Sequence, residues 1–378
     1  MKKCIVVSDS FKGTLPSSRI CALARDVFGR IMPDCELITV PVADGGEGTV
    51  DCFVQALGAR RVFTSVSGPY GEPVRAGFAV IGETAIIEMA SAAGLPLVGD
   101  KKDPMRAGTR GVGQLIAHAV SGGCKKILLG LGGSATNDGG CGCAYALGAV
   151  FTDINGRSFV PTGGTLRDIE KIDLSGVKKL LGGVEVTVMC DVDNPLYGKN
   201  GAAYVFAPQK GADAQGVEIL DDNLRHLARK ILECTGADVS ELPGGGAAGG
   251  MGAGCVAFLG GRLCSGIDAI LDAVSFDDML EGTDMVISGE GKLDSQSLQG
   301  KVVSGVARRT GAKGVPLVVL SGVVDDSAAD VYCRGVSAVF CTNRAARPVS
   351  ELHEHCESDY TSALSDILRL VKIVEGIS

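Results

Sequence analysis

The chain has 378 residues, and its 36 Lys and Arg against 44 Asp and Glu give a formal net charge of −8. Because one hydrophobic core rarely serves so long a chain, we expect two domains. Hydrophobic residues make up 46% and charged residues 21% of the chain, which is typical of a folded globular protein. The acidic balance and the low aromatic content (11 Phe, 6 Tyr and no Trp) argue against a protein that binds nucleic acid.

The sequence also argues against a secreted or membrane-spanning protein. Only four apolar residues separate Lys3 from Ser8, too few for a signal peptide, and no run of eighteen apolar residues is present. The 14 cysteines are scattered and form no Cys-x-x-Cys pair, so we expect reduced thiols in a cytoplasmic protein. Cys141-x-Cys143 and His353-x-His355-Cys356 could bind metal in principle, but they lack the two well-spaced ligand pairs of a zinc site.

Both ends of the chain show the pattern of parallel strands that lead into helices. Short runs rich in Val and Ile end in Gly, Asp or Ser and are followed by helix-like stretches. At the N-terminal end this predicts strands at Cys4–Val7 and Glu36–Val40, a helix at Ser17–Ile31, and a second helix that ends at Leu57. At the C-terminal end it predicts strands at Asp284–Ser288, Pro316–Ser321 and Ala338–Thr342, and a closing helix at Ser362–Val374.

The middle of the chain has a different texture. Short Gly/Pro turns separate three predicted strands, which suggests antiparallel pairing in a mixed sheet. These strands are Val62–Val66, Val74–Ile81 and Ala85–Met89; a helix near Gly113–Val120, a strand at Lys126–Leu129, a helical run at Cys143–Val150 and a strand at Val184–Met189 follow. The stretch Leu242–Gly250 is rich in Gly and Ala, and we interpret it as a loop in close backbone contact. We infer one α/β domain formed by residues 1–67 and 269–378, with a mixed α/β (α+β) domain, residues 68–268, inserted.

A glycine-rich segment, Gly130-Leu-Gly-Gly-Ser-Ala-Thr-Asn-Asp-Gly-Gly140, follows a predicted strand and precedes a helical run. Glycines let the backbone close on an anion, and N–H groups at a helix N-terminus can donate to it. A nucleotide phosphate or a substrate carboxylate would suit this loop. The segment also fits the dinucleotide pattern G-x-G-x-x-A, but that pattern is weak alone and the expected acidic residue is poorly placed. A Walker A motif is absent from the sequence.

Acidic side chains recur beside predicted strand ends, where ligands of α/β sheets collect. They are Asp9, Asp44 with Glu47, Asp191 with Asp193, and Glu290 with Asp294. Carboxylates gathered in this way suit Mg²⁺, a hard cation that favours oxygen ligands. Four lysines, Lys12, Lys210, Lys292 and Lys301, lie in or beside such loops and could offset phosphate charge.

These motifs resemble those of the bacterial type 1 glycerate kinase family over nearly the whole chain. The matching strings are Asp9-Ser-Phe-Lys-Gly13, Val40-Pro-Val-Ala-Asp-Gly-Gly-Glu-Gly-Thr49, the segment 130–140, Cys190-Asp-Val-Asp-Asn-Pro-Leu196, Gly201-Ala-Ala-Tyr-Val-Phe-Ala-Pro-Gln-Lys-Gly211 and Ser288-Gly-Glu-Gly-Lys-Leu-Asp-Ser-Gln296 with Gly300-Lys301. The resemblance implies ATP- and Mg²⁺-dependent phosphorylation of D-glycerate, usually at the 2-hydroxyl. It also implies a flavodoxin-like domain interrupted by a second domain, with the active site in the cleft between them. A homodimer is compatible with it.

We expect Asp191 and Asp193 to form the catalytic carboxylate centre, one nearer Mg²⁺ and one nearer the attacking hydroxyl, because Asn194-Pro195 turns the chain there. Lys12 is expected to contact an anionic group. The residues expected to contact substrate or phosphate are Asp9, Ser10, Asp44, Gly45, Gly46, Glu47, Gly132, Gly133, Ser134, Thr136, Asn137, Asp138, Lys210, Glu290, Lys292, Asp294 and Lys301.

Three other functions fit parts of the same pattern. They are a kinase of similar fold for another sugar acid, a GHMP-type kinase suggested by Gly130–Ala135, and a catalytically silent regulator that binds a sugar acid. The carboxylates at several loops argue against the silent regulator, because a binder needs no metal. The segment Gly108–Leu115 departs from the family pattern at Arg110, Val112 and Gln114, which leaves the substrate range open. Phosphorylation at the 3-hydroxyl is also left open.

Overall fold

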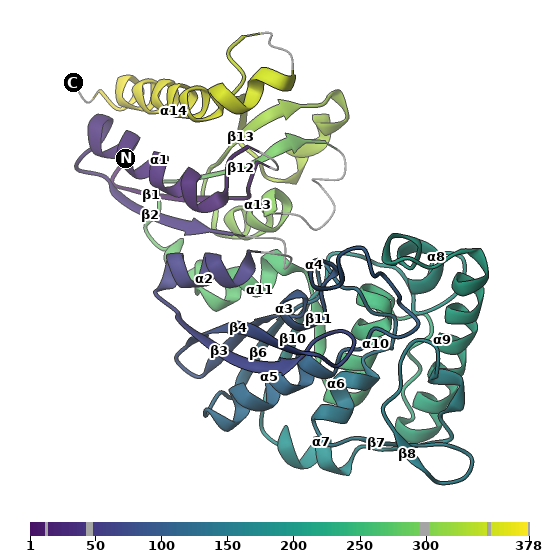
Figure 1. Cartoon of the computed structure of the whole chain (residues 1–378). Helices are drawn as coiled ribbons and strands as arrows, with labels where there is room; N and C mark the ends of the chain where they lie inside the picture. Colours follow the sequence, from purple (N-terminus) through teal and green to yellow (C-terminus); the bar gives the residue numbers. More distant parts are fainter. Residues whose placement is uncertain (12–13, 43–47, 295–301, 346–348, 377–378) are drawn as a thin grey trace. The chain divides into compact units, whose positions relative to one another are not determined.

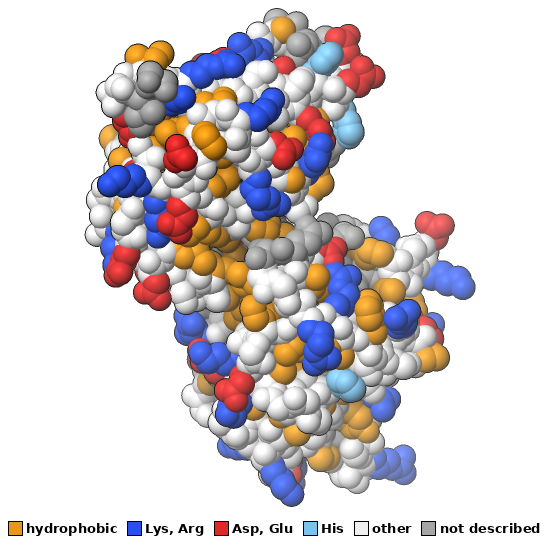
Figure 2. Space-filling model, turned by 90° about the vertical axis from the view of Figure 1, so that its left-hand side faces the viewer, with side chains coloured by type: hydrophobic (Ala, Val, Ile, Leu, Met, Phe, Trp, Pro, Cys, Tyr) orange, Lys and Arg blue, Asp and Glu red, His pale blue; other side chains and the backbone are white. Residues whose placement is uncertain are grey.

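The computed structural model describes residues 1–11, 14–42, 48–294, 302–345 and 349–376. The chain divides into two compact units, drawn in Figure 1. Unit 1 consists of Met1–Asp44, Asp51–Gly58 and Ser265–Ser378, and therefore combines both ends of the chain. Unit 2 consists of Gly45–Val50 and Ala59–Cys264. On the face shown in Figure 2, side chains of both charge signs occur on each unit.

Unit 1 is built on a sheet of five parallel strands in the order β14-β13-β12-β1-β2. Their bounds are β1 Lys3–Ser8, β2 Glu36–Pro41, β12 Met285–Leu293, β13 Leu317–Val324 and β14 Ala338–Cys341. Counted in chain order, this is the 2-1-3-4-5 arrangement of flavodoxin-like folds. The expected flavodoxin-like α/β fold is therefore confirmed for this part of the chain.

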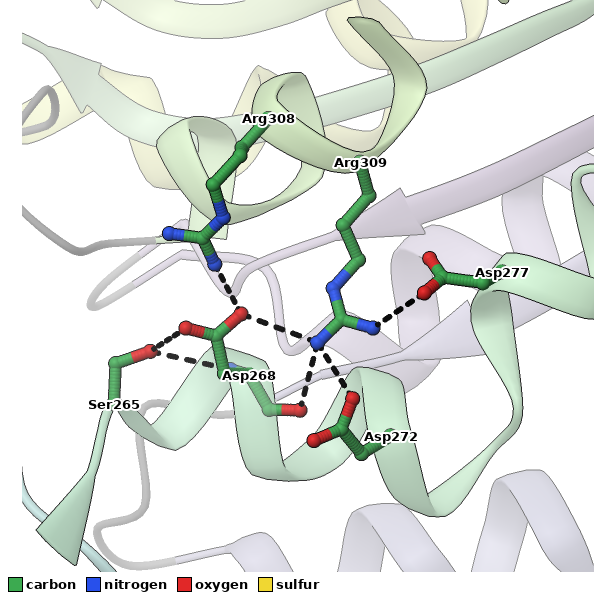
Figure 3. A network of polar contacts seen from close by, with 6 residues as sticks. All are labelled: Ser265, Asp268, Asp272, Asp277, Arg308 and Arg309. Carbon is green, nitrogen blue, oxygen red and sulfur yellow. Dashed lines mark hydrogen bonds and ion pairs between the residues drawn. The ribbon is translucent and has the colours of Figure 1, made fainter. Parts of the chain in front are cut away.

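Helices of unit 1 cover the sheet. They are α1 Ser17–Ile31, α2 Thr49–Leu57, of which residues 51–57 belong to this unit, α11 Gly266–Ala273, α12 Phe276–Met279, α13 Val302–Lys313 and α14 Val349–Val374, with a 3₁₀ segment η4 at Asp326–Arg334. α1 and α14 lie side by side and share one hydrophobic core with alternate residues of β1, such as Cys4 and Val6 (Figure 1). Arg309 on α13 forms ion pairs with Asp268 and Asp272 of α11, which ties these two helices together (Figure 3).

Unit 2 is built on a six-stranded mixed sheet in the order β11-β10-β6-β5-β4-β3. The strands are β3 Arg60–Ser67, β4 Pro73–Ile81, β5 Thr84–Glu88, β6 Lys126–Gly130, β10 Glu185–Met189 and β11 Arg262–Cys264. β3, β4 and β5 pair antiparallel, as the short turns between them predicted. β5, β6, β10 and β11 run parallel, so their carboxyl ends reach one edge of the sheet.

The remaining elements of unit 2 pack around this sheet. The helices are α3 Ala90–Ala93, α4 Leu95–Val98, α5 Arg110–Ser121, α6 Cys141–Ala146, α7 Ser175–Leu180, α8 Ala202–Phe206, α9 Ala214–Thr235 and α10 Ala247–Leu259, with 3₁₀ turns η1 Leu166–Asp168 and η2 Pro208–Lys210. A small sheet, β8-β7-β9, is formed by β7 Val150–Thr152, β8 Ser158–Phe159 and β9 Lys171–Asp173. α5 packs on β3, β4 and β5, and α10 packs on β10 and β11.

Three predicted elements differ most from the structure in their bounds. The helical run expected to reach Val150 ends at Ala146, because Gly148 adopts a left-handed φ of 104° and the chain then enters β7. β12 continues beyond Ser288 to Leu293, since it pairs with β13 as far as Leu293↔Val324. α14 begins at residue 349 rather than 362, because its polar first half hides the helical period and contributes few core residues such as Tyr360.

Two expectations from composition can be compared with the structure. The 14 cysteines are all free thiols, and six of them are buried. Among the described residues, none of the helices is long and apolar enough to cross a bilayer.

Candidate active site

The carboxyl edge of the unit 2 sheet brings several predicted site segments together. In the parallel register Glu88 lies opposite Gly130, and Gly130 lies opposite Met189. The glycine-rich segment 131–140 and the segment 190–195 therefore leave neighbouring strands at the same edge. This is the location where open α/β sheets place their ligands.

Asp138 organises the glycine-rich segment from inside. Its carboxylate accepts hydrogen bonds from the backbone N–H and the hydroxyl of Thr109, both at 2.8 Å, and from the N–H groups of Gly140 (3.0 Å) and Gly142 (3.1 Å). Burial raises the pKa of this carboxyl group, although the four hydrogen bonds oppose the shift. We expected Asp138 to contact a ligand and the start of the following helix to donate to an anion. In this structure the Asp138 carboxylate accepts from Gly140 and Gly142 at the start of α6 and so shapes the loop, while a ligand contact of Asp138 stays a prediction.

Lys210 lies buried against the same segment. It is only 1% exposed, and its Nζ donates to the hydroxyl oxygen of Ser134 (2.8 Å) and to the carbonyl oxygen of Thr136 (2.7 Å). Burial lowers the pKa of the Lys210 ammonium to about 7, while the charge of Asp138 opposes this shift. Among the described residues, Asp138 supplies the negative charge that opposes this shift, and an anion placed nearby would further stabilise the charged form of Lys210.

Two residues of the loop carry polar atoms without protein partners. The side chains of Thr136 and Asn137 are fully buried. Thr136 Oγ1 and both amide atoms of Asn137, Nδ2 and Oδ1, find no hydrogen-bond partner among the described residues. Since buried polar groups in native proteins are nearly always paired, these atoms mark a place that a ligand or water could complete.

A second glycine-rich segment, 244–250, touches both loops at this sheet edge. A Cβ on Gly249 would lie 2.0 Å from the carbonyl oxygen of Thr136, and one on Gly246 would lie 2.2 Å from the carbonyl oxygen of Pro195. Close backbone contact was predicted for this stretch, and it is confirmed. Ala248 lies between them with a left-handed φ of 54°, which costs a non-glycine residue about 1–2 kcal/mol. Such strain persists where the surrounding structure requires it, often at functional sites.

Asp191 and Asp193 follow β10 directly and are exposed. The neighbouring Asn194 fixes the turn after them, because its Nδ2 donates to the carbonyl oxygen of Asn200 (2.8 Å) and its own carbonyl accepts from Gly246 N–H (2.9 Å). Within the described part of the chain, His, Cys, Asp and Glu side chains form no group of three that could hold a metal ion. Asp191 and Asp193 therefore supply at most a pair of carboxylate ligands.

Two residues at this edge were missed by the sequence reasoning. Glu88 ends β5, and its Oε1 accepts a hydrogen bond from the Val50 N–H at 2.7 Å. Its place at a predicted strand end was the available signal. Thr109 gave no such signal in the sequence, because its hydroxyl pairs with Asp138, which lies 29 residues away. Arg110, Val112 and Gln114 make structural contacts: Arg110 lies over the Tyr145 ring, Val112 is buried, and Gln114 accepts from Ser67 N–H (2.7 Å).

Unit 1 contains the other predicted site residues that the structure describes. Asp9 follows β1, and its Oδ1 accepts from Ser10 N–H at 2.7 Å. Glu290 is buried inside β12 rather than in a loop after it, and the strand also contains Lys292. Lys292 pairs with Asp294 (3.4 Å) and with Asp325 (3.3 Å). Because both partners favour its charged form, the pKa of Lys292 is raised.

The predicted residues therefore fall into two groups, one in each unit. Gly132, Gly133, Ser134, Thr136, Asn137, Asp138, Asp191, Asp193 and Lys210 belong to unit 2, whereas Asp9, Ser10, Glu290, Lys292 and Asp294 belong to unit 1. Lys12, Asp44, Gly45, Gly46, Glu47 and Lys301 lie outside the described residues.

Comparison with known proteins shows which family the chain belongs to. A model of the Glycerate kinase family matches residues 4–372. The chain belongs to the glycerate kinase family. It is 41% identical over 374 residues to a glycerate kinase of Bacillus cereus, with 98% of each protein covered, and 43% identical over 341 residues to a glycerate 2-kinase of Escherichia coli K12, with 89% of this chain and 90% of the relative covered.

The fold comparison agrees with family membership. A crystal structure described as that of a glycerate kinase 2 from Salmonella typhimurium LT2 superposes with a TM-score of 0.89 at 37% identity, covering 99% of each chain. The protein is therefore an enzyme of a kinase family, and membership of such a family implies ATP as the phosphoryl donor.

Proposed function

We propose that this chain transfers the γ-phosphoryl group of ATP to D-glycerate, and that the product is 2-phosphoglycerate. The choice of the 2-hydroxyl is supported by the relative named glycerate 2-kinase. The observation in this structure that most favours the activity is the meeting of two loops at one sheet edge. One contains the carboxylates Asp191 and Asp193, and the other contains Ser134 and Thr136, against which the buried Lys210 of η2 packs.

The carboxylates have the chemistry that the transfer needs. An attacking hydroxyl must lose its proton, and we assign Asp193 to accept it. We assign Asp191 to Mg²⁺. Oxygen ligands suit this hard cation, which commonly uses one or two carboxylates together with substrate phosphates and water, so a single aspartate fits it. When bound, the metal would neutralise phosphate charge during transfer.

The loop residues would position the substrate and balance charge. Gly132, Gly133, Ser134, Thr136 and Asn137 are proposed to bind an anionic group of substrate or nucleotide, with Lys210 as the nearby cation. In unit 1, Asp9, Ser10, Glu290, Lys292 and Asp294 are proposed to contact substrate or phosphate, as are Lys12, Asp44, Gly45, Gly46, Glu47 and Lys301, which lie outside the described residues. Phosphoryl transfer depends mainly on such positioning and charge stabilisation.

A coupled assay that measures ADP formation tests this proposal. We expect ADP to form in the presence of Mg²⁺ only when D-glycerate is added. Phosphorus NMR of the product then separates 2-phosphoglycerate from 3-phosphoglycerate.

Three results would contradict parts of the proposal. ADP formation with another sugar acid but not with D-glycerate would reassign the substrate. D-glycerate binding without ADP formation would make the chain a silent binder. The NMR signal of 3-phosphoglycerate would overturn the assignment to the 2-hydroxyl.

A further inference from the structure

Asn137 and Asn223 are both buried in unit 2, but their side-chain amides differ in hydrogen bonding. Asn223 is 3% exposed, and its Nδ2 donates to the carbonyl oxygen of Gly163 at 2.7 Å. Asn137 is 0% exposed, and neither Nδ2 nor Oδ1 has a hydrogen-bond partner among the described residues. A buried amide without partners is destabilising, so the residue at position 137 needs a reason other than folding.

The chemistry of an amide restricts what can pair with it. Nδ2 donates and Oδ1 accepts, so a partner that satisfies both must accept one hydrogen bond and donate another. Phosphate and carboxylate oxygens only accept. A hydroxyl can do both, and a hydroxyl next to a carboxylate supplies the two functions within one small molecule. Thr136 Oγ1, also without a described partner, adds a further donor and acceptor beside Asn137.

The surroundings of Asn137 favour a negatively charged molecule. Lys210 holds the preceding residues through Ser134 Oγ and the Thr136 carbonyl, using two of its three N–H donors. The one carboxylate among the charges acting on Lys210, that of Asp138, already accepts four hydrogen bonds from the loop and from Thr109. An enclosed anion would therefore meet a cation whose charge is weakly compensated.

The backbone packed against Asn137 leaves little space. Gly249 approaches its Cα so closely that a Cβ on Gly249 would lie 2.5 Å from it. The segment 248–250 keeps three consecutive left-handed residues to make this approach. Because Asn137 is completely enclosed, a ligand that pairs with its amide must be small.

We propose that Asn137 is a specificity-determining residue that pairs with a hydroxyl of a small hydroxy acid, and that Lys210 is a positioning residue that holds the Ser134–Asn137 turn in its binding shape. This inference rests on the proposed function, in which the hydroxy acid is D-glycerate. It adds that the loop selects the substrate's hydroxyl as well as its charge.

The test compares D-glycerate with two analogues that each lack one hydroxyl, D-lactate and 3-hydroxypropionate. Isothermal titration calorimetry measures each Kd for the full chain in the presence of Mg²⁺ and a non-transferable ATP analogue. For the unsubstituted protein we expect at least one analogue to bind about tenfold or more weakly than D-glycerate, because the amide would lose its partner. The ratio of the analogue Kd to the D-glycerate Kd measures this selection. In Asn137→Leu, whose new side chain is similar in size, that ratio should fall towards one.

Asn223→Leu is the matched control. It removes an amide that does have a partner, so its Tm should fall by about 2–4 °C while the ratio of Kd values stays as in the unsubstituted protein. Asn137→Leu should keep or raise the Tm of the ligand-free protein. Asn137→Ala serves the same purpose if the Leu variant does not fold. Lys210→Met should weaken D-glycerate and both analogues together, because it disturbs the turn rather than the selection.

Two outcomes would overturn the inference. If Asn137→Leu and Asn137→Ala keep the ratio of the unsubstituted protein, the amide is satisfied by water and selects nothing. If the unsubstituted protein binds D-glycerate and both analogues equally, no hydroxyl is recognised. Either result leaves the proposed function standing when the coupled assay still shows phosphorylation of D-glycerate. Conversely, the ratio of Kd values could depend on Asn137 while the coupled assay shows no phosphorylation of D-glycerate. That result would contradict only the proposed function.

Discussion

Lys210 in unit 2 and Arg309 in unit 1 are both cations among polar groups, but their surroundings differ in burial and in charge. Arg309 is 14% exposed and pairs with Asp268 (3.3 Å), Asp272 (2.6 Å) and Asp277 (3.2 Å), as Figure 3 shows. Burial tends to lower the pKa of Arg309, but the hydrogen bonds and charges of Asp272, Asp268 and Asp277 together outweigh it and the pKa is raised. Lys210 is enclosed with neutral oxygens, and burial lowers its pKa.

The comparison separates two uses of a buried or half-buried charge. The Arg309 network is saturated with carboxylates and joins α13 to α11 and α12, which is a structural use. Around Lys210, by contrast, Asp138 is the one carboxylate whose charge opposes the effect of burial. The side chains of Thr136 and Asn137, in the same turn, have polar atoms without partners among the described residues. A site that an anionic ligand completes would have these properties. We therefore base the proposed site on uncompensated burial rather than on the number of polar side chains.

The largest effect should separate the proposed active-site edge of unit 2 from the Arg309 network of unit 1. Asp193→Asn keeps the size of the side chain but removes the proton acceptor, so we expect turnover to fall by about 10²- to 10⁴-fold with little change in ATP affinity. Asp277→Asn, the same change in the Arg309 network, should leave turnover unchanged. Steady-state kinetics of both variants at saturating Mg²⁺ measure this. Near-normal turnover of a folded Asp193→Asn variant would move the role of base to another carboxylate.

A smaller effect should appear in the pH dependence of stability. An unfolded lysine keeps its proton up to about pH 10.4, whereas Lys210 loses its proton above about pH 7 in the folded protein. Between these values the unfolded state binds more protons, so the free energy of unfolding should rise with pH by up to about 1.4 kcal/mol per unit. Lys210→Met should lack this rise.

The free energy of unfolding of the full chain, measured by urea unfolding across this pH range, tests this prediction. Lys230→Met is the control, since Lys230 pairs with Glu170 (3.4 Å) and Glu233 (3.2 Å) and should not produce such a rise. A Lys210→Met variant with the same pH dependence as the unsubstituted protein would show that Lys210 keeps an ordinary pKa.

Much of the fold was predictable because strands such as β1 and β6 contain continuous apolar runs. The helix at Ser17–Ile31 has the expected bounds, and all predicted strands are present. The site was predictable only as residue types near strand ends. Lys210 and Asp138 were both expected to contact a ligand, which stays a prediction, but the sequence did not indicate their burial or their distant partners. Lys210 meets Ser134 across 76 positions of sequence, and no local pattern indicates such a contact.

Most substitutions lower the free energy of unfolding, but a substitution at the strained Ala248 should raise it. Ala248→Gly removes the cost of a left-handed alanine, partly offset by the greater freedom of glycine in the unfolded chain. We expect the free energy of unfolding to rise by about 0.5–1 kcal/mol, measured by urea unfolding. Ala253→Gly, in the same helix at a position not found among the left-handed residues, should instead be destabilising. A destabilised Ala248→Gly variant would contradict the strain.

The smallest effect is expected in the exposed part of the Arg309 network. Arg308 pairs with Asp268 but is 63% exposed, so Arg308→Gln should lower the free energy of unfolding by less than about 1 kcal/mol. The difference should shrink further in high salt, because salt screens exposed charges. Thermal unfolding at low and high ionic strength measures both. A salt-independent loss of several kcal/mol would show that this network is more than a surface reinforcement.

A crystal structure with D-glycerate, Mg²⁺ and a non-transferable ATP analogue tests the central claim most directly. The account predicts D-glycerate at the carboxyl edge of the unit 2 sheet, with a hydroxyl within hydrogen-bond distance of the Asn137 amide and the Lys210 bonds to Ser134 and Thr136 intact. D-glycerate and nucleotide both located away from the 134–137 turn, with water on the Asn137 amide, would contradict it.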